Sequence, residues 1–580
     1  MIQQLLHTVL VSVICIIWGI PVLLWSQKYL QADRFWFVSL PGLLAFLFFM
    51  GCISVGVLSS WLLLFLPLKF PYLLLLTFIL TTILFLKKFQ DVKNIFKEVN
   101  KTRTRVSIPE YVYLFLGIIL FVIMGSVKPV NLDMQIYHLQ IIRWQTEYGT
   151  VPGMANLFPR FGQGSNWFNL VSFFYLPFLK SSNFAYVNIS FVSWFFIWLF
   201  FKCRYHLNQE GHKTHRLLSL YYFCLFIFFM LDWQLYRDAA NSTNYDVPVT
   251  AFIIMAISFL IEKFVTNEPV TSFSPLFLLL AIAVISFKFS AIFLILLIIY
   301  YLLLHNKFSR WLWTGVAGVI IVLPVLIRNY ITSGYPFFPH PFSISTPDWK
   351  VPEAFAKGYF QFLLDYNRFF NYWMFIGKVP DTPLNWVPYW YKGILIQHKI
   401  ILFLAAGSLV LLIVKPLRDI NYRNLRILIV IGIFMIAGWF FSAPDPARFG
   451  YGFLLPLAFL TFSIFAAPFF YKAIFKMCLF ISIAGVAYYS YNKMQTLVES
   501  PVHFLYPMTS DTPPYQNKEI EGMEVHVPEI INNGWDHRCF NTVLPCMPGD
   551  NPYIKPRGSS LKQGFKMMPP DSAFLKQYLY

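Results

Sequence analysis

The sequence predicts an all-α polytopic membrane protein, a helical bundle of about fourteen transmembrane helices. Three observations lead to this fold class. The chain of 580 residues is 57% hydrophobic and only 12% charged, whereas soluble domains are roughly 45–50% apolar. Apolar runs long enough to cross a bilayer recur along the whole chain. Much of the Lys and Arg lies in short loops between these runs, as is typical of cytoplasmic loops.

The runs are expected to be helices, because a backbone that faces lipid must satisfy its own hydrogen bonds. We expect them at residues 5–25, 36–57, 62–86, 109–127, 183–201, 217–231, 248–264, 272–286, 290–304, 311–327, 400–414, 424–441, 451–468 and 473–490. The first run lacks the basic start and the cleavage site of a signal peptide, so we count it as a span. Residues 272–304 are one apolar stretch interrupted by Lys288, which we interpret as a hairpin of two short spans with Lys288 at the outer turn.

The basic cluster at residues 87–107 sets the orientation, because basic loops stay in the cytoplasm. The polar segments then expected outside are 128–182, 232–247, 328–399 and 442–450. We expect three regions: N-terminal helices with the basic loop (1–108), a transmembrane catalytic module (109–490) and an outer C-terminal tail (491–580). Nearly all polar mass thus lies on one face, where we expect the function.

Charge and motifs exclude several function classes. The net charge of +18 reflects the basic loops, so it is a topology signal rather than evidence for nucleic-acid binding. No Walker loop, dinucleotide fingerprint or Gly-x-Ser-x-Gly elbow occurs, so nothing supports ATP-driven or serine-hydrolase chemistry. No internal repeat is apparent, which disfavours an inverted-repeat transporter.

Asp133 is the first candidate for a catalytic residue. It follows an apolar run directly, in a polar and aromatic segment (residues 128–169) that cannot lie in lipid. A carboxylate there suits a general base or a metal-anchoring group for sugar transfer, in which an acceptor hydroxyl loses its proton. The alternative is a helix cap. Helical spacing places Tyr137 and Gln140 on the face of Asp133, whereas His138 points elsewhere and, as a lone His, is more often structural.

These residues carry a resemblance to a known class of enzymes. The order Asp133, Tyr137, the turn YGTVP at 148–152 and the segment 160–167 resembles the first outer loop of GT-C glycosyltransferases. This class includes the aminoarabinose–lipid A and protein O-mannosyl transferases, which take sugars from polyprenyl-phosphate carriers. The motifs NLDxxxYH, GYPFFP and PDPARFG look closer still to a Bacteroidota-type family of bacterial membrane proteins.

The resemblance implies a GT-C-like bundle and a set of site residues. Asp133, Tyr137 and His138 are then expected among the catalytic residues, and Gln140 and Arg160 among those that bind substrate. Many members carry adjacent acidic residues. Here Met134 follows Asp133, which leaves metal use and the identity of the base open.

Asp238 and Asp246, in the second outer segment RDAANSTNYDVP, are candidate metal ligands, and Asp246 is also expected to assist Asp133 in catalysis. Related enzymes often place a metal ligand or acceptor-orienting group there, and two carboxylates in one loop could share a divalent cation, Mg²⁺ or Mn²⁺, with Asp133. The alternative is an ion pair of Asp238 with Arg237 and a turn at Asp246.

Lys288, Arg328 and Arg448 lie at the outer ends of spans, against the positive-inside bias. Cations there could bind the phosphate of a polyprenyl-phosphate donor, and the planar fork of Arg suits phosphate oxygens. The alternative is snorkelling to the interface or pairing with a nearby carboxylate, with Asp445 as the obvious partner of Arg448.

Cys539 and Cys546 are the only two cysteines that fall together in a polar region. Outside the cytoplasm this spacing predicts a disulfide that closes a small loop. A zinc site that adds His537 would lack a fourth ligand.

Together these patterns predict a GT-C-type glycosyltransferase in a bacterial inner membrane, with its site on the periplasmic face. The expected partners are a polyprenyl-phosphate-linked sugar or glycan, a periplasmic acceptor and the lipid bilayer, with no nucleic acid and no ATP. The alternatives are a protein oligosaccharyltransferase or an O-antigen polymerase or ligase, and a lipid-linked glycan flippase. A flippase should carry polar residues along a path through its spans, where Lys288 is nearly alone.

Overall fold

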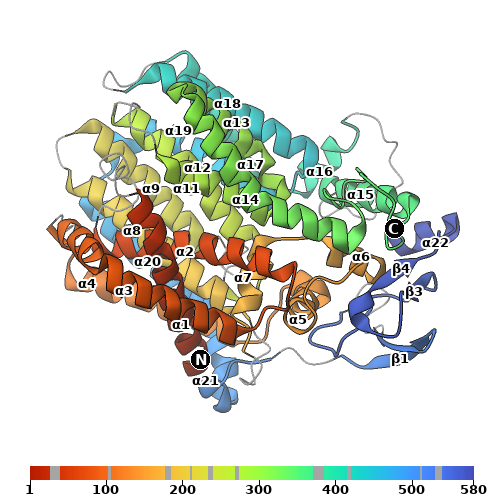
Figure 1. The fold of residues 1–580 in the computed structure, drawn as a ribbon. Helices are drawn as coiled ribbons and strands as arrows, with labels where there is room; N and C mark the ends of the chain where they lie inside the picture. The colour runs from red at the N-terminus through yellow and green to blue at the C-terminus, as the bar shows by residue number, and fades with distance from the viewer. Residues whose placement is uncertain are drawn as a thin grey trace.

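The computed structural model describes the chain except residues 27–38, 102–105, 177–183, 210–211, 233–239, 268–273, 370–383, 415–419, 510–512, 530–537 and 580. Helices dominate the described chain, and eleven of them are long and apolar enough to cross a membrane (Figure 1). They are α1 (Ile2–Ser26), α2 (Leu40–Leu63), α3 (Phe70–Lys101), α4 (Ile108–Ser126), α8 (Tyr186–Asn208), α9 (Lys213–Leu231), α11 (Asp246–Val265), α14 (Phe308–Ser333), α18 (Tyr422–Ser442), α19 (Tyr451–Ala466) with the short turns η7 (Pro446–Gly450) and η8 (Ala467–Phe469), and α20 (Lys472–Glu499). The expectation of a helical, multi-pass membrane protein is therefore confirmed.

The number of long spans among the described residues is eleven, or twelve with one bent pair, rather than about fourteen. The bent pair joins α16 (Val387–Gly393) to α17 (Ile396–Gly407) and η6 (Ser408–Leu412) at an angle of 116°. Two other expected runs form helices too short to count, α12 (Pro275–Phe287) and η4 (Phe289–Leu294) with α13 (Ile295–His305). These two helices are apolar enough to cross a membrane but too short to count as long spans.

The short helices α12 and α13 form the predicted hairpin. The backbone N–H of Ser274, which precedes α12, donates to the hydroxyl of Tyr301 near the end of α13 at 2.5 Å. The ring of Tyr301 also packs against Phe277, with the ring centroids 4.7 Å apart. The start of one helix thus lies beside the end of the other, and Lys288, in extended conformation between them, occupies the tip.

Helix α11 lies at the centre of the bundle. All its residues are buried, because apolar side chains recur around its whole circumference. It packs against α12, α18 and α19 and touches η7 at the start of α19. The first residue of this buried helix, Asp246, therefore lies at the same end of the bundle as η7.

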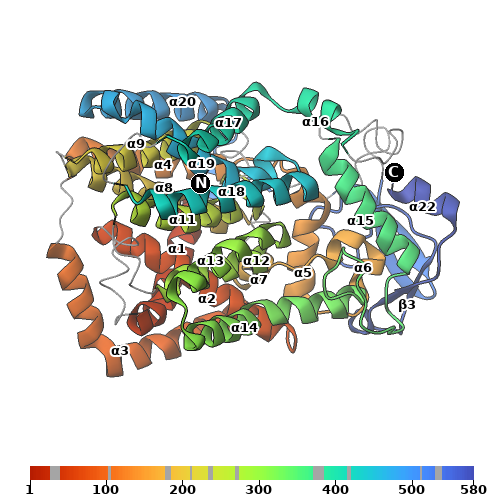
Figure 2. The same ribbon diagram turned by 90° about the horizontal axis from the view of Figure 1, so that it is seen from above.

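The polar segments gather at that end. The loop after α4 folds into η2 (Met134–His138), α5 (Leu139–Glu147), α6 (Met154–Leu157), η3 (Pro159–Gly162) and α7 (Asn166–Phe173). Beside α5 and α6 lie α15 (Glu353–Arg368) and the C-terminal tail (Figures 1 and 2). The tail contains α21 (Val502–Leu505), the antiparallel pairs β1 (Tyr515–Ile520) with β2 (Met523–Pro528) and β3 (Ile554–Pro556) with β4 (Phe565–Met567), η9 (Leu561–Gln563) and α22 (Ser572–Leu579).

The tail packs onto the loop after α4 rather than standing apart. Its buried side chains Val525, Met547 and Phe565 share one hydrophobic cluster with Trp144 and Val151 of that loop. The backbone N–H of Phe565 also donates to the carbonyl of Pro152 at 3.1 Å. These contacts fix the tail over the end of the bundle that carries the candidate site.

Candidate active site

Five charged side chains form one continuous ion-pair network. Asp133 binds Arg160 through Oδ1 at 2.6 Å and Arg448 through Oδ2 at 2.5 Å. The guanidinium of Arg448 also reaches Asp246, with Nε 2.9 Å from Oδ2. The other oxygen of Asp246 binds the ammonium of Lys288. Arg448 therefore joins the two carboxylates, with Arg160 and Lys288 at the ends of the chain.

Two π-helical turns position the centre of this network. Asp133 precedes η2, where the N–H of Leu139 donates five residues back, to the carbonyl of Met134. Arg448 lies inside η7, and the carboxylate of Asp445 accepts its backbone N–H at 3.2 Å. Turns of this rare type occur frequently at functional sites. Both put an extra residue into one helical turn and so re-aim the side chains around them.

Two of the three remaining residues lie where helices begin or end. Asp246 is the first residue of α11, and its backbone N–H donates to the side-chain oxygen of Asn244 at 2.8 Å. Lys288 lies at the tip of the α12–α13 hairpin. Its ammonium sits 5.0 Å from the ring centre of Tyr245 and 3.5 Å from that of Phe449. Aromatic faces stabilise a cation in such positions.

The network is more buried at one end than at the other. The side chains of Asp246 and Lys288 are only 5% and 9% exposed, whereas those of Arg160 and Arg448 are 20% and 25% exposed. Arg160 lies over the ring of Tyr137, 5.2 Å from its centre. Asp246 and Lys288 thus form a buried floor, and the two guanidiniums form the accessible edge.

Burial and the charges of the network shift the pKa values of nearby groups outside the spans. Burial alone would raise the pKa of Asp133, but the guanidiniums of Arg448 and Arg160 outweigh it and hold this pKa well below its usual value. Burial lowers the pKa of His138 to about 3 and raises that of Asp445 to about 6. At neutral pH, Asp133 is therefore ionised and the His138 ring is neutral.

His138 lies near the network without joining its ion pairs, and the charges of Asp133 and Asp246 act on its ring. Its Nδ1 lies 3.1 Å from the hydroxyl of Thr243, and its buried Nε2 has no hydrogen-bond partner among the described residues.

A divalent cation does not fit this arrangement. All four oxygens of Asp133 and Asp246 are bonded to cationic side chains, and three cations against two carboxylates leave a net charge of +1. In the described chain no group of three or more His, Cys, Asp and Glu side chains is placed to hold a metal ion. Asp238, the third expected ligand, lies outside the described residues. The network suits an anion instead.

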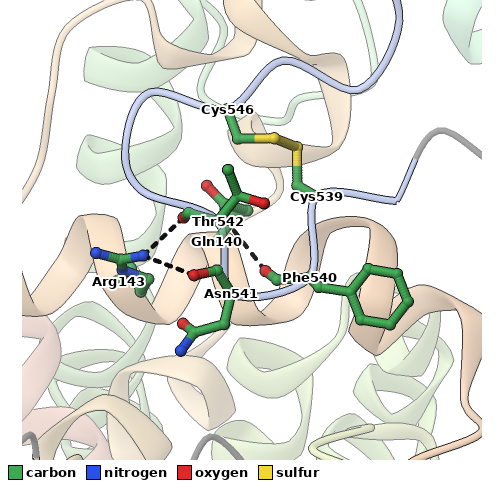
Figure 3. Close-up of a disulfide and its surroundings, with 7 residues drawn as sticks. All are labelled: Gln140, Arg143, Cys539, Phe540, Asn541, Thr542 and Cys546. Carbon is green, nitrogen blue, oxygen red and sulfur yellow. Dashed lines mark hydrogen bonds between the residues drawn. A yellow bond between two sulfur atoms is a disulfide. The ribbon is translucent and has the colours of Figure 1, made fainter. Parts of the chain in front are cut away.

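Two predicted binding residues lie outside the network. Arg328 is buried in α14 and has no part in the ion pairs. Gln140 faces the tail, where its side-chain amide donates to the carbonyls of Phe540 and Thr542 at 3.2 and 2.9 Å (Figure 3). Its place is explained by η2, which displaces the residues after Asp133 from regular helical spacing.

The predicted disulfide between Cys539 and Cys546 is present and closes the loop that Gln140 contacts (Figure 3). Arg143 of α5 donates to two further carbonyls of this loop, those of Asn541 and Thr542, at 2.8 and 2.7 Å. The loop thus holds the helix that follows Asp133. His537, the third residue considered for a zinc site, lies outside the described residues.

Asp445 has a different role from the one its sequence position indicates. The alternative to phosphate binding by Arg448 is an ion pair with Asp445, but this carboxylate caps η7, and the guanidinium pairs with Asp133 and Asp246 instead. The motif PDPARFG contains the signal for this cap, an Asp directly before a Pro that opens a helical turn.

Comparison with known proteins gives one match. A family model described as Domain of unknown function (DUF8201) covers residues 1–455. No curated protein and no solved structure matches the chain. The matched region includes all five residues of the network and ends before the C-terminal tail.

Proposed function

The chain belongs to the family described as domain of unknown function DUF8201, and we propose that it is an integral-membrane glycosyltransferase of the GT-C type. It transfers a sugar or glycan from a polyprenyl-phosphate carrier to an acceptor on the periplasmic face of a bacterial inner membrane. The observation that carries the proposal is the ion-pair network, a cationic, partly exposed group of side chains with an ionised carboxylate at its centre. Sugar transfer from a phosphate carrier needs both charges in one place.

The cationic side chains bind the donor. Arg448 and Lys288 bind the phosphate that links the sugar to the lipid, with Arg160 at the opposite edge, and charge-assisted bonds to phosphate are the strong kind. As the bond between the anomeric carbon and the phosphate oxygen breaks, the leaving phosphate takes the electron pair. Fixed cations stabilise the charge that develops there.

Asp133 acts as the general base for the acceptor hydroxyl. Its carboxylate takes the proton of the acceptor hydroxyl while the hydroxyl oxygen attacks the anomeric carbon, which inverts the configuration. With its pKa held low by two guanidiniums, Asp133 is a weak base in the resting network. A phosphate that draws Arg448 and Arg160 toward itself would raise that pKa. Donor binding thereby activates the base, so the proton moves only when a sugar is in place.

The charge distribution supports an enzyme over a lipid-linked glycan flippase. Along the buried helix α11 no ionisable residue occurs between Asp246 and Glu262, so its interior offers no charged path across the bundle. Charged side chains lie at the two ends of α11, in the network at Asp246 and in the buried pair of Lys202 with Glu262, with none along the helix between them. The size of the unit in the product distinguishes the transfer of single sugars from the transfer of whole glycans.

The experiment is envelope-glycan mass spectrometry on cells that lack the protein, complemented with the wild type or with Asp133→Asn. We expect the wild type to restore a glycan or glycoprotein that Asp133→Asn does not restore, because an amide cannot accept the proton. The size of the missing unit distinguishes a single-sugar transferase from a polymerase, ligase or oligosaccharyltransferase.

Asp348→Asn is the matched control. Asp348 is another carboxylate of the outer segments, 58% exposed and paired with Arg557, and its variant should restore the glycan fully. Full restoration by Asp133→Asn, at wild-type protein levels, would refute the proposed role of the carboxylate.

A further inference from the structure

Arg328 is a buried cation without a counter-charge. It is 2% exposed, and none of its three guanidinium nitrogens has a hydrogen-bond partner among the residues that the structure describes. Each cation of the network, in contrast, faces a carboxylate. An isolated charge away from water is unfavourable unless something pairs with it. Among the described residues nothing pairs with it, and its position therefore suits a bound partner of opposite charge.

The surroundings of Arg328 point its guanidinium at a close-fitting loop. A Cβ atom on Gly164 would lie 2.9 Å from Nη1 of Arg328 and 2.3 Å from the side-chain oxygen of Asn329. The backbone N–H of Gly164 donates to that same oxygen at 2.9 Å. A side chain at position 164 would therefore clash with Asn329 and crowd the guanidinium of Arg328.

This loop connects Arg328 to the network. Gly164 follows Arg160 by four residues, so their Cα atoms are at most about 14 Å apart. The next residue, Ser165, donates to the carbonyl of Phe287 at 2.7 Å, and Phe287 immediately precedes Lys288. Sequence and hydrogen bonds thus tie the loop at Arg328 to the segments that carry Arg160 and Lys288, yet neither carboxylate of the network pairs with Arg328.

We propose that Arg328 forms a second anion subsite beside the network and binds a phosphate group that the network does not hold. The planar guanidinium, with all its nitrogens unpaired, matches the bidentate geometry of phosphate oxygens. For its ligand this inference rests on the proposed function. The phosphate has two candidate sources, the second phosphate of a diphosphate-linked donor or a phosphate on the acceptor.

Thermal unfolding of the purified protein in detergent tests the subsite without any sugar transfer. The probes are inorganic phosphate, farnesyl phosphate and farnesyl diphosphate, and ligand binding to the folded state raises the unfolding temperature. We expect Arg328→Gln to unfold at or above the wild-type temperature in anion-free buffer, because it removes an unpaired buried charge. We expect it to lose the stabilisation by inorganic phosphate that remains after the network is saturated with farnesyl phosphate.

Two further variants complete the design. Arg310→Gln, on the same helix, removes a guanidinium that donates to the carbonyl of His305, and its anion response should equal that of the wild type. Arg328→Lys keeps the charge but loses the fork, so it should retain a weaker phosphate response. It provides the measurement if Arg328→Gln does not fold.

The outcomes separate the two sources. If farnesyl diphosphate stabilises the wild type at lower concentration than farnesyl phosphate and Arg328→Gln abolishes the difference, the subsite serves a diphosphate donor. If the two prenyl ligands act alike and inorganic phosphate adds its own shift through Arg328, it serves the acceptor. An unchanged anion response in both Arg328 variants, or earlier unfolding of Arg328→Gln without anions, overturns the proposal. If the anions shift the unfolding temperature as expected but no sugar transfer is detected, the proposed enzyme activity is refuted and the anion subsite is still supported.

Discussion

Asp445 is the residue through which pH should act on stability. Its carboxylate is buried beside the network, and burial raises its pKa to about 6. A carboxyl group whose pKa is raised on folding stabilises the fold while it is protonated, and this contribution is lost as pH rises through the folded value. Between about pH 4 and pH 6 the free energy of unfolding should therefore fall, by on the order of 2–3 kcal/mol from this group.

The variant Asp445→Asn tests this directly, because its side-chain oxygen can still accept the N–H of Arg448. We expect the dependence of stability on pH between 4 and 6 to flatten in Asp445→Asn, as measured by thermal unfolding across that range. Asp550→Asn, at an exposed ion pair with Lys518, should keep the wild-type slope. An unchanged slope in Asp445→Asn would assign the dependence to other groups.

The sequence predicted the residues of the network better than their pairing. Asp133, Asp246, Lys288 and Arg448 stand out because charged side chains at membrane exits are unusual. Their bonds could not be predicted, since Arg448 and Asp133 are 315 positions apart and no local rule links them. Arg448 does pair with carboxylates, as the alternative to phosphate binding predicts, but with Asp133 and Asp246 rather than with Asp445, which binds the backbone.

At the scale of elements, the π-helical turns explain where regular spacing failed. A period of 3.6 residues correctly placed helices such as α4 and α11, and the interruption at Lys288 correctly predicted a hairpin. The same period misplaced Gln140, because η2 holds an extra residue. Wide turns have no sequence signature as clear as a proline or a cap, so such errors fall at the site itself.

The loop closed by Cys539 and Cys546 is the second element with a measurable role. It binds α5 through Gln140 and Arg143. The disulfide that closes the loop also lowers the conformational entropy of the unfolded chain. We expect replacement of both cysteines by serine to lower stability by about 2–3 kcal/mol. Thermal unfolding with and without a thiol reductant measures this, and reductant should lower the wild type to the level of the double variant.

The free cysteine Cys478, half-buried in α20, provides the control, because its replacement by serine should leave the effect of reductant unchanged. If the double variant unfolds at the wild-type temperature, the disulfide does not stabilise the tail.

At the scale of the whole molecule, one end of the bundle carries everything that the proposed chemistry needs. The start of α11, the tip of the α12–α13 hairpin, the end of α14 and the start of α19 meet beneath the loop that follows α4. The tail then covers this loop (Figures 1 and 2). The chain therefore uses its helices as a scaffold and its polar segments as the site.

This arrangement predicts the side of the membrane on which each loop lies. The hairpin returns the chain to the end where α12 began, so Asn306, between α13 and α14, should face the cytoplasm. Thr346, beyond the far end of α14, should face the periplasm, and both residues are exposed. In spheroplasts, a membrane-impermeant maleimide should label Thr346→Cys at once and Asn306→Cys only after permeabilisation, in a protein whose five free cysteines are replaced. Immediate labelling of Asn306→Cys would mean that α12 and α13 cross as one span, which would reverse every later loop.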